Sequence, residues 1–145
     1  MDAFDADVLI YAAVPGHLLG RRVRALFAAS PVGAAGGFIG IGSVLLLSEV
    51  LAKPLREHAV DELADLGELL GRLDLRPTDA ATAELATALA AAYRLRAGDA
   101  VHLATAVNAG AHRFITNNSR DFPKSITEID VTYPADLDDP GVARR

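Results

Sequence analysis

The chain has 145 residues, of which 51% are hydrophobic and 23% are charged, and it contains no cysteine. This length and composition predict one domain with ample material for a core. The lack of cysteine excludes disulfides and thiolate metal sites. The formal net charge of -5 argues against a broad basic surface for duplex DNA. We therefore expect any nucleic acid to be held locally, through a metal ion and a few arginines.

Short apolar runs alternate with helical patterns along the chain. In the first half we expect a strand ending at residues 3–5, helices at 8–13 and 18–29, a buried strand at 38–41, and a helix that Ser43 caps and that ends at Lys53 before Pro54. In the second half we expect helices at 57–72, 78–95 and 98–109, strands at 73–76, 113–116 and 129–132, and a loop at 117–122.

This alternation predicts an α/β fold, with a parallel central sheet of about five short strands and helices on both faces. Ligand sites of such sheets lie beyond the carboxyl ends of the strands. We expect a single domain over residues 1–135 and a C-terminal tail over 136–145.

One uncharged stretch, the 24 residues from Ala25 to Ser48, is long enough to span a bilayer. A predicted turn at Ser30-Pro31 and the glycines that follow divide it into turn, strand and helix, which argues against a span. The opening MDAFDADV lacks the basic region and apolar run of a signal peptide. A cytoplasmic protein is therefore expected.

Four acidic residues stand at predicted strand ends or within apolar helices, where a structural role explains them poorly: Asp5, Glu49, Asp99 and Asp121. Two carboxylates about 5 Å apart repel by roughly 3 kcal/mol at an effective dielectric of about 20. A converging cluster therefore needs a cation. Mg²⁺ prefers carboxylate oxygens and keeps several of its waters, and such sites most often act on phosphates.

Each candidate has a structural alternative. Asp7 is interpreted as the N-cap of the first helix, which leaves Asp5 for the metal. Asp99 follows Gly98 at a predicted helix start, so capping is its default role. Glu49 lies one turn before Lys53, and a solvated ion pair or a half-buried carboxylate that needs a cation both remain open.

His102 is interpreted as a packed or surface histidine, since no second histidine shares its spacing. The segment from Thr116 to Asp121 is dense in turn-forming residues. It also places the Thr116 hydroxyl and the Asn117 and Asn118 amides beside the Asp121 carboxylate. This mixture can bind a metal-bridged phosphate.

With these residues assigned, the chain resembles the PIN domains, specifically the VapC-type toxins of bacterial toxin–antitoxin pairs. FDADVLIYA is similar to the first motif of the family, and SEVLAKPLR to the second motif around its glutamate. LRAGDAVHLATAVNAGAHRFITNNSRDF resembles the third and fourth motifs, and IDVTYPADL the closing strand and tail. The resemblance runs nearly end to end.

The resemblance implies a ribonuclease dependent on Mg²⁺ or Mn²⁺, with Asp5, Glu49 and Asp99 as metal-binding catalytic carboxylates. The family often has an aspartate where this chain has Asn118, so Asp121 or Asn118 completes the site. Thr116 and Asn117 would orient ligands or the phosphate. The resemblance also implies an RNA substrate and a cognate antitoxin.

Apolar helix faces around residues 45–51 and 85–92 further predict a homodimer. One alternative is a catalytically weak PIN-fold module that binds nucleic acid or protein, since Asn118 is neutral. A second is a haloacid-dehalogenase-like phosphatase, whose D-x-D motif Asp5-Ala6-Asp7 imitates. That family needs its glycine-aspartate motif after the threonine, whereas Gly98-Asp99 precedes Thr116 here.

Overall fold

A single parallel sheet organises the molecule. The computed structural model describes residues 1–29 and 37–142. Within this part, five strands pair in the order β3-β2-β1-β4-β5, and every neighbouring pair is parallel. The α/β fold predicted from the alternation of elements is confirmed. The strands are β1 (Asp2–Phe4), β2 (Gly40–Ser43), β3 (Leu73–Arg76), β4 (Arg113–Ile115) and β5 (Asp130–Thr132).

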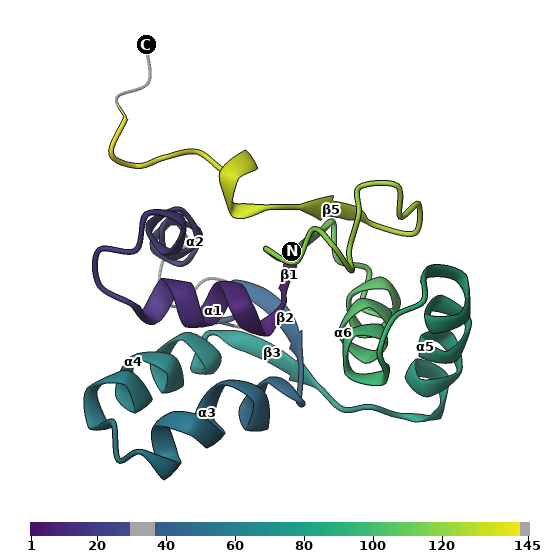
Figure 1. The fold of residues 1–145 in the computed structure, drawn as a ribbon, viewed down its shortest axis with the longest axis horizontal. Helices are drawn as coiled ribbons and strands as arrows, with labels where there is room; N and C mark the ends of the chain where they lie inside the picture. The colour runs from purple at the N-terminus through teal and green to yellow at the C-terminus, as the bar shows by residue number, and fades with distance from the viewer. Residues whose placement is uncertain (30–36, 143–145) are drawn as a thin grey trace.

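Helices cover both faces of this sheet. Figure 1 shows α1–α4 on one side and the pair α5 and α6 on the other. No helix of the described residues is long and apolar enough to cross a membrane. The helices are α1 (Ala6–Ala13), α2 (Leu18–Ala28), α3 (Leu46–Arg56), α4 (Val60–Gly71), α5 (Ala80–Tyr93) and α6 (Ala97–Asn108), followed by a short 3₁₀ turn, η1 (Pro134–Asp136).

The two faces of the sheet bury separate hydrophobic clusters. Successive side chains of a strand point to opposite faces, so Phe4 and Ile115 pack with α1–α4, whereas Ala3 and Phe114 pack with α5 and α6. Phe4, Phe114 and Ile115 are at most 1% exposed. The central strands therefore hold both layers together, and their carboxyl ends are fixed from either side.

Strand β2 lies closer to the C-terminus than predicted. The apolar pair Phe38-Ile39 suggested a strand at 38–41, but Phe38 is exposed and the strand spans Gly40–Ser43. A Cβ atom on Gly40 would lie 2.6 Å from the Phe4 ring, and one on Gly42 would lie 2.5 Å from Leu46. Neighbouring side chains occupy that space, so glycine fits this strand better than a larger apolar residue.

The predicted limits of helix α3 were also wrong. Ser43 does not cap it: Ser43 belongs to β2, where its hydroxyl accepts a hydrogen bond from the backbone N–H of Leu45, and Leu45 is the N-cap. The helix also continues through Pro54 to Arg56. Proline removes a single N–H, and because Pro54 lies in the last turn and is buried, the helix loses little by including it.

Other helix ends follow from local capping. Helix α5 begins after Asp79, whose side chain accepts a hydrogen bond from the N–H of Thr82, and it ends at Arg94, which has a left-handed backbone with φ of 57°. His58, with φ of 54°, separates α3 from α4. Helices α4 and α5 are therefore shorter than the predicted helices at 57–72 and 78–95. The predicted turn at Ser30-Pro31 lies outside the described residues.

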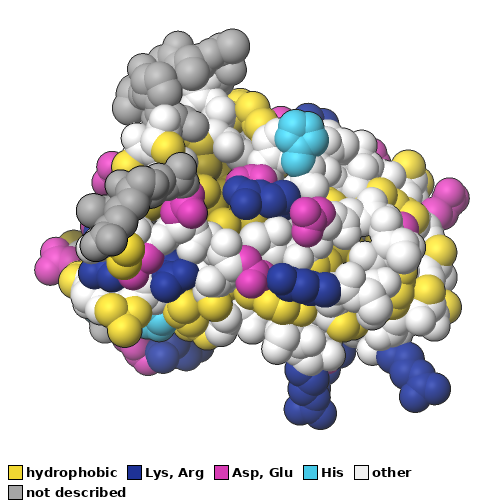
Figure 2. All heavy atoms as spheres, turned by 90° about the horizontal axis from the view of Figure 1, so that it is seen from above, with side chains coloured by type: hydrophobic (Ala, Val, Ile, Leu, Met, Phe, Trp, Pro, Cys, Tyr) yellow, Lys and Arg dark blue, Asp and Glu magenta, His cyan; other side chains and the backbone are white. Residues whose placement is uncertain are grey.

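The C-terminal segment packs onto α2. Leu137 is buried with the cluster around α1–α4, and its carbonyl accepts a hydrogen bond from Arg22 at 2.9 Å. Arg21 pairs with Asp139 at 2.8 Å. On the face seen from above, basic side chains are interspersed with acidic ones (Figure 2). Among the described residues, this face therefore carries no continuous basic patch.

The close approach of α1 and α2 depends on Gly20. A Cβ atom at Gly20 would lie 1.9 Å from the carbonyl oxygen of Tyr11. We predict that Gly20→Ala forces the helices apart and lowers the free energy of unfolding by about 1–3 kcal/mol. Gly67 in α4 has open space around its Cβ position, so Gly67→Ala should instead stabilise by up to about 1 kcal/mol. Urea unfolding of both variants tests this, and equal stabilities would contradict it.

Candidate active site

Asp5 lies at the point where β1 and β4 end side by side. It is 6% exposed. Its Oδ1 accepts the N–H of Ala6 at 2.8 Å, and its Oδ2 accepts the hydroxyl of Thr116 at 2.8 Å. Asp5 is thus the N-cap of α1, a role that the sequence had assigned to Asp7. Burial raises the pKa of Asp5. The interaction with His102 and the hydrogen bonds from Thr116 and Ala6 lower it by less, and the charge of Glu49 adds a small further rise.

Asp7 joins α1 to the loop that follows β4. Its Oδ2 accepts the backbone N–H of Asn117 at 3.1 Å. Its Oδ1 is buried and has no hydrogen-bond partner within the described part of the chain. Burial, then the charge of Asp5, and to a smaller extent Asp99, raise the pKa of Asp7 to about 7. Asp7 therefore belongs to the acidic site, where sequence analysis had given it a capping role.

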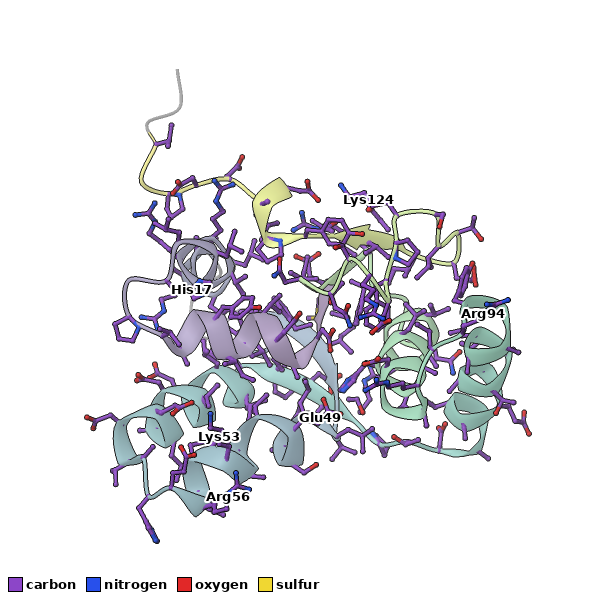
Figure 3. All side chains as sticks on the ribbon, viewed as in Figure 1. His17, Glu49, Lys53, Arg56, Arg94 and Lys124 are labelled. Atoms are coloured by element: carbon purple, nitrogen blue, oxygen red, sulfur yellow. The ribbon has the colours of Figure 1, made fainter. Side chains whose placement is uncertain are left out.

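Glu49 points from α3 toward α6. Its Oε2 lies 2.9 Å from Nε2 of His102, and the carboxylate is 37% exposed. Figure 3 shows Glu49 at the end of α3 beside α6, with Lys53 and Arg56 further along the helix. Of the two alternatives that the sequence left open, the structure favours a half-buried carboxylate over a solvated pair with Lys53.

Asp99 lies in the first turn of α6 without capping it. The helix begins at Ala97, and its N-cap is Arg96, so the default capping role of Asp99 is not observed. Burial raises the pKa of Asp99, followed by the charges of Asp5 and Asp121. The Asp99 side chain is therefore coupled to groups from β1 and from the loop after β4.

The loop after β4 is held by its own side chains. The Asn118 amide donates to Oδ2 of Asp121 at 2.9 Å, and its Oδ1 accepts the Asp121 backbone N–H at 3.2 Å. The Asn118 N–H donates to the Thr116 hydroxyl oxygen at 3.1 Å. Phe122, which is fully buried, anchors the loop on the core. Asn118 and Asp121 therefore act as a pair.

The acidic groups converge from four segments, yet within residues 1–29 and 37–142 no three His, Asp or Glu side chains already form a group that could hold one ion. Two observations favour a bound cation. One is the electrostatic coupling among Asp5, Glu49, Asp99 and Asp121, and the other is the unpartnered Oδ1 of Asp7. Mg²⁺ takes one or two carboxylates directly and keeps several waters. The oxygen-rich donor set fits such an ion.

The model of the PIN domain family matches residues 3–125. The chain belongs to the PIN domain family. This confirms the resemblance seen in the sequence motifs and argues against the haloacid-dehalogenase alternative. No curated protein shows a significant match to the sequence.

Solved structures share the fold. A toxin–antitoxin complex from Klebsiella pneumoniae has a chain with 24% identity and a TM-score of 0.71, over 92% of this PIN domain chain and 98% of that chain. VapBC2 from Rickettsia felis, bound to a promoter DNA fragment, matches with 17% identity and a TM-score of 0.68, over 91% and 97%. FitAB bound to an IR36 DNA fragment matches with 19% identity and a TM-score of 0.66, over 95% and 98%.

Two contacts of this PIN domain were missed by sequence reasoning. One is the bond from Asp7 to the Asn117 N–H, and the other is the pair formed by His102 and Glu49. The spacing of Asp99 and His102, three residues apart on one helix, puts both on the same face and could have indicated the second contact. The first depends on tertiary structure, since 110 residues separate its partners.

The raised pKa of Asp7 predicts a pH-dependent stability. Folded Asp7 holds its proton up to about pH 7, whereas unfolded Asp7 releases it near 3.8. The folded state therefore binds more protons between these values, so Asp7 contributes stability at low pH that is lost as pH rises toward 7. Urea unfolding in EDTA at pH 5 and pH 8 should show a larger loss for the wild type than for Asp7→Asn. The same loss in both proteins would refute the assignment.

Proposed function

We propose that this PIN domain is a metal-dependent endoribonuclease and the toxin of a toxin–antitoxin pair. The observation that supports this best is the convergence of acidic groups at the carboxyl ends of β1 and β4, where Asp5 is buried beside Thr116. The motifs that resemble VapC-type toxins, and the shared fold of toxin–antitoxin structures, agree with the proposal.

In this proposal Asp5, Glu49, Asp99 and Asp121 hold Mg²⁺ or Mn²⁺. The bound ion would activate a water and neutralise charge on the phosphodiester that is cleaved. Thr116 fixes the Asp5 carboxylate by donating to Oδ2.

The loop is positioned by two further contacts. Asp7 holds the Asn117 backbone, and the Asn117 amide lies 3.4 Å from the Tyr11 hydroxyl. Both contacts join the loop after β4 to α1. Thr116 and Asn117 would thereby orient the substrate phosphate or the side chains that bind the metal ion.

We propose a cognate antitoxin and a second copy of the chain as protein partners, in the cytoplasm. Apolar side chains on the α3–α4 pair are exposed, with Leu47 at 41%, Leu55 at 62% and Val60 at 73%. Exposed apolar surface of this kind is typical of interaction sites. The homodimer is predicted from apolar faces around residues 45–51 and 85–92. Leu46, Val50 and Leu89 of these segments are buried within the chain, and Leu47 is exposed.

The function predicts RNA cleavage that requires Mg²⁺ or Mn²⁺ and stops in EDTA. Asp5→Asn and Asp99→Asn should each lower the cleavage rate by about a hundredfold or more, because a lost charge misplaces the ion. Glu84→Gln, which changes an exposed carboxylate on α5, is the matched control and should cleave normally. RNA that is bound but left intact by the wild type in Mg²⁺ would support the alternative of a binding module.

Asp121 is predicted to complete the site in preference to Asn118. The Oδ1 of Asn118 already accepts the Asp121 N–H, and a carboxylate supplies charge as well as an oxygen. Asp121→Asn should therefore weaken Mn²⁺ binding much more than Asn118→Ala. Calorimetric titration of both variants measures this, and an unchanged affinity for Asp121→Asn would remove Asp121 from the site.

A further inference from the structure

His102 is buried beneath the acidic site and makes one directional contact there. Its side chain is 1% exposed, and its Nε2 lies 2.9 Å from Oε2 of Glu49. An ionised carboxylate can only accept a hydrogen bond, so Nε2 carries the proton and donates it. The contact joins α6 to α3, and its two residues are 53 positions apart in the sequence.

The surroundings of the His102 imidazole indicate that this residue does more than fill space in the core. Nδ1 is buried and has no partner within the described residues. A buried ring nitrogen without a partner is unfavourable, and an apolar side chain at this position of α6 would avoid that penalty. The hydrogen bond to Glu49 is thus the polar interaction that a histidine offers here and a leucine does not.

The burial of His102 also excludes direct contact with a substrate. A side chain that is 1% exposed cannot reach RNA, whereas the Glu49 carboxylate is 37% exposed. The hydrogen bond of His102 therefore acts on the site through Glu49, and its electrostatic interaction also lowers the pKa of Asp5 and of Asp99. A Cβ atom built on Gly98 would lie 3.6 Å from Oε1 of Glu49. This second oxygen therefore lies beside the first turn of α6, which also contains Asp99.

We propose that His102 is the positioning residue of the metal site: it fixes Oε2 of Glu49 and leaves Oε1 free for the cation. This role rests on the proposed function, because it assigns Glu49 to the metal. Residues that orient metal ligands in this way typically change metal affinity by about 10–100-fold when they are replaced. Glu49, on a helix of the opposite layer from Asp99, needs such an anchor because a free glutamate rotates about three side-chain bonds.

The test is a double-mutant cycle on Mn²⁺ affinity, measured by calorimetry on the full chain without RNA. His102→Leu should weaken binding by about tenfold or more, while His102→Gln, which keeps an N–H donor, should recover part of the affinity. Within a Glu49→Gln background, His102→Leu should have little further effect, because the side chain that His102 positions no longer carries the charge that holds the ion. His112→Leu, at an exposed histidine, is the matched control.

The outcomes separate the two proposals. Unchanged affinity in His102→Leu, or an equal loss in the presence and absence of Glu49→Gln, would overturn the positioning role while Glu49→Gln alone still reports on the metal site. A wild type that binds no Mn²⁺ would overturn the metal-dependent function and the positioning role with it. Circular dichroism verifies folding, and if His102→Leu fails to fold, the cycle is run with His102→Gln, whose affinity should then fall between that of the wild type and that of Glu49→Gln.

Discussion

The mutual repulsion of carboxylates at the carboxyl ends of the central strands is the constraint on which the site depends. Asp5 is buried at the end of β1, and Asp99 is electrostatically coupled both to Asp5 and to Asp121. Two ionised carboxylates about 5 Å apart repel by roughly 3 kcal/mol at an effective dielectric of about 20. The fold holds them in place through backbone and hydroxyl donors, such as Thr116 on Asp5, and a cation would remove the remaining cost.

The strand order explains why the two layers of helices both reach these strand ends. Strand β1 lies between β2 and β4 at the centre of the sheet, so its end is flanked by both layers. Helix α3 of one layer supplies Glu49, and α6 of the other supplies Asp99 and His102. The bond between Glu49 and His102 therefore ties the layers together where the charges meet, and the geometry of the site depends on both cores.

Sequence reasoning predicted the fold class and most elements, because period and turn chemistry report on local structure. It failed where a distant side chain decided the outcome. The glycines of β2 are required by Phe4 and Leu46, which no local pattern reveals. Asp7 illustrates the same limit: capping is a local role, whereas its contact with Asn117 requires β1 and β4 to pair. The acidic candidates were visible as isolated charges in apolar segments. The family resemblance indicated Thr116 as an orienting residue, whereas the contact of Glu49 with His102 was missed.

A crystal structure with Mn²⁺ bound would show whether the acidic residues hold a cation, since the anomalous signal of the ion locates it without reference to activity. We expect an anomalous peak between Asp5 and Asp99, with Oε1 of Glu49 turned toward it and Oε2 still held by His102. Crystals saturated with Mn²⁺ that show no peak at the carboxyl ends of β1 and β4, or a peak bound only by other residues, would rule out a cation held by these carboxylates.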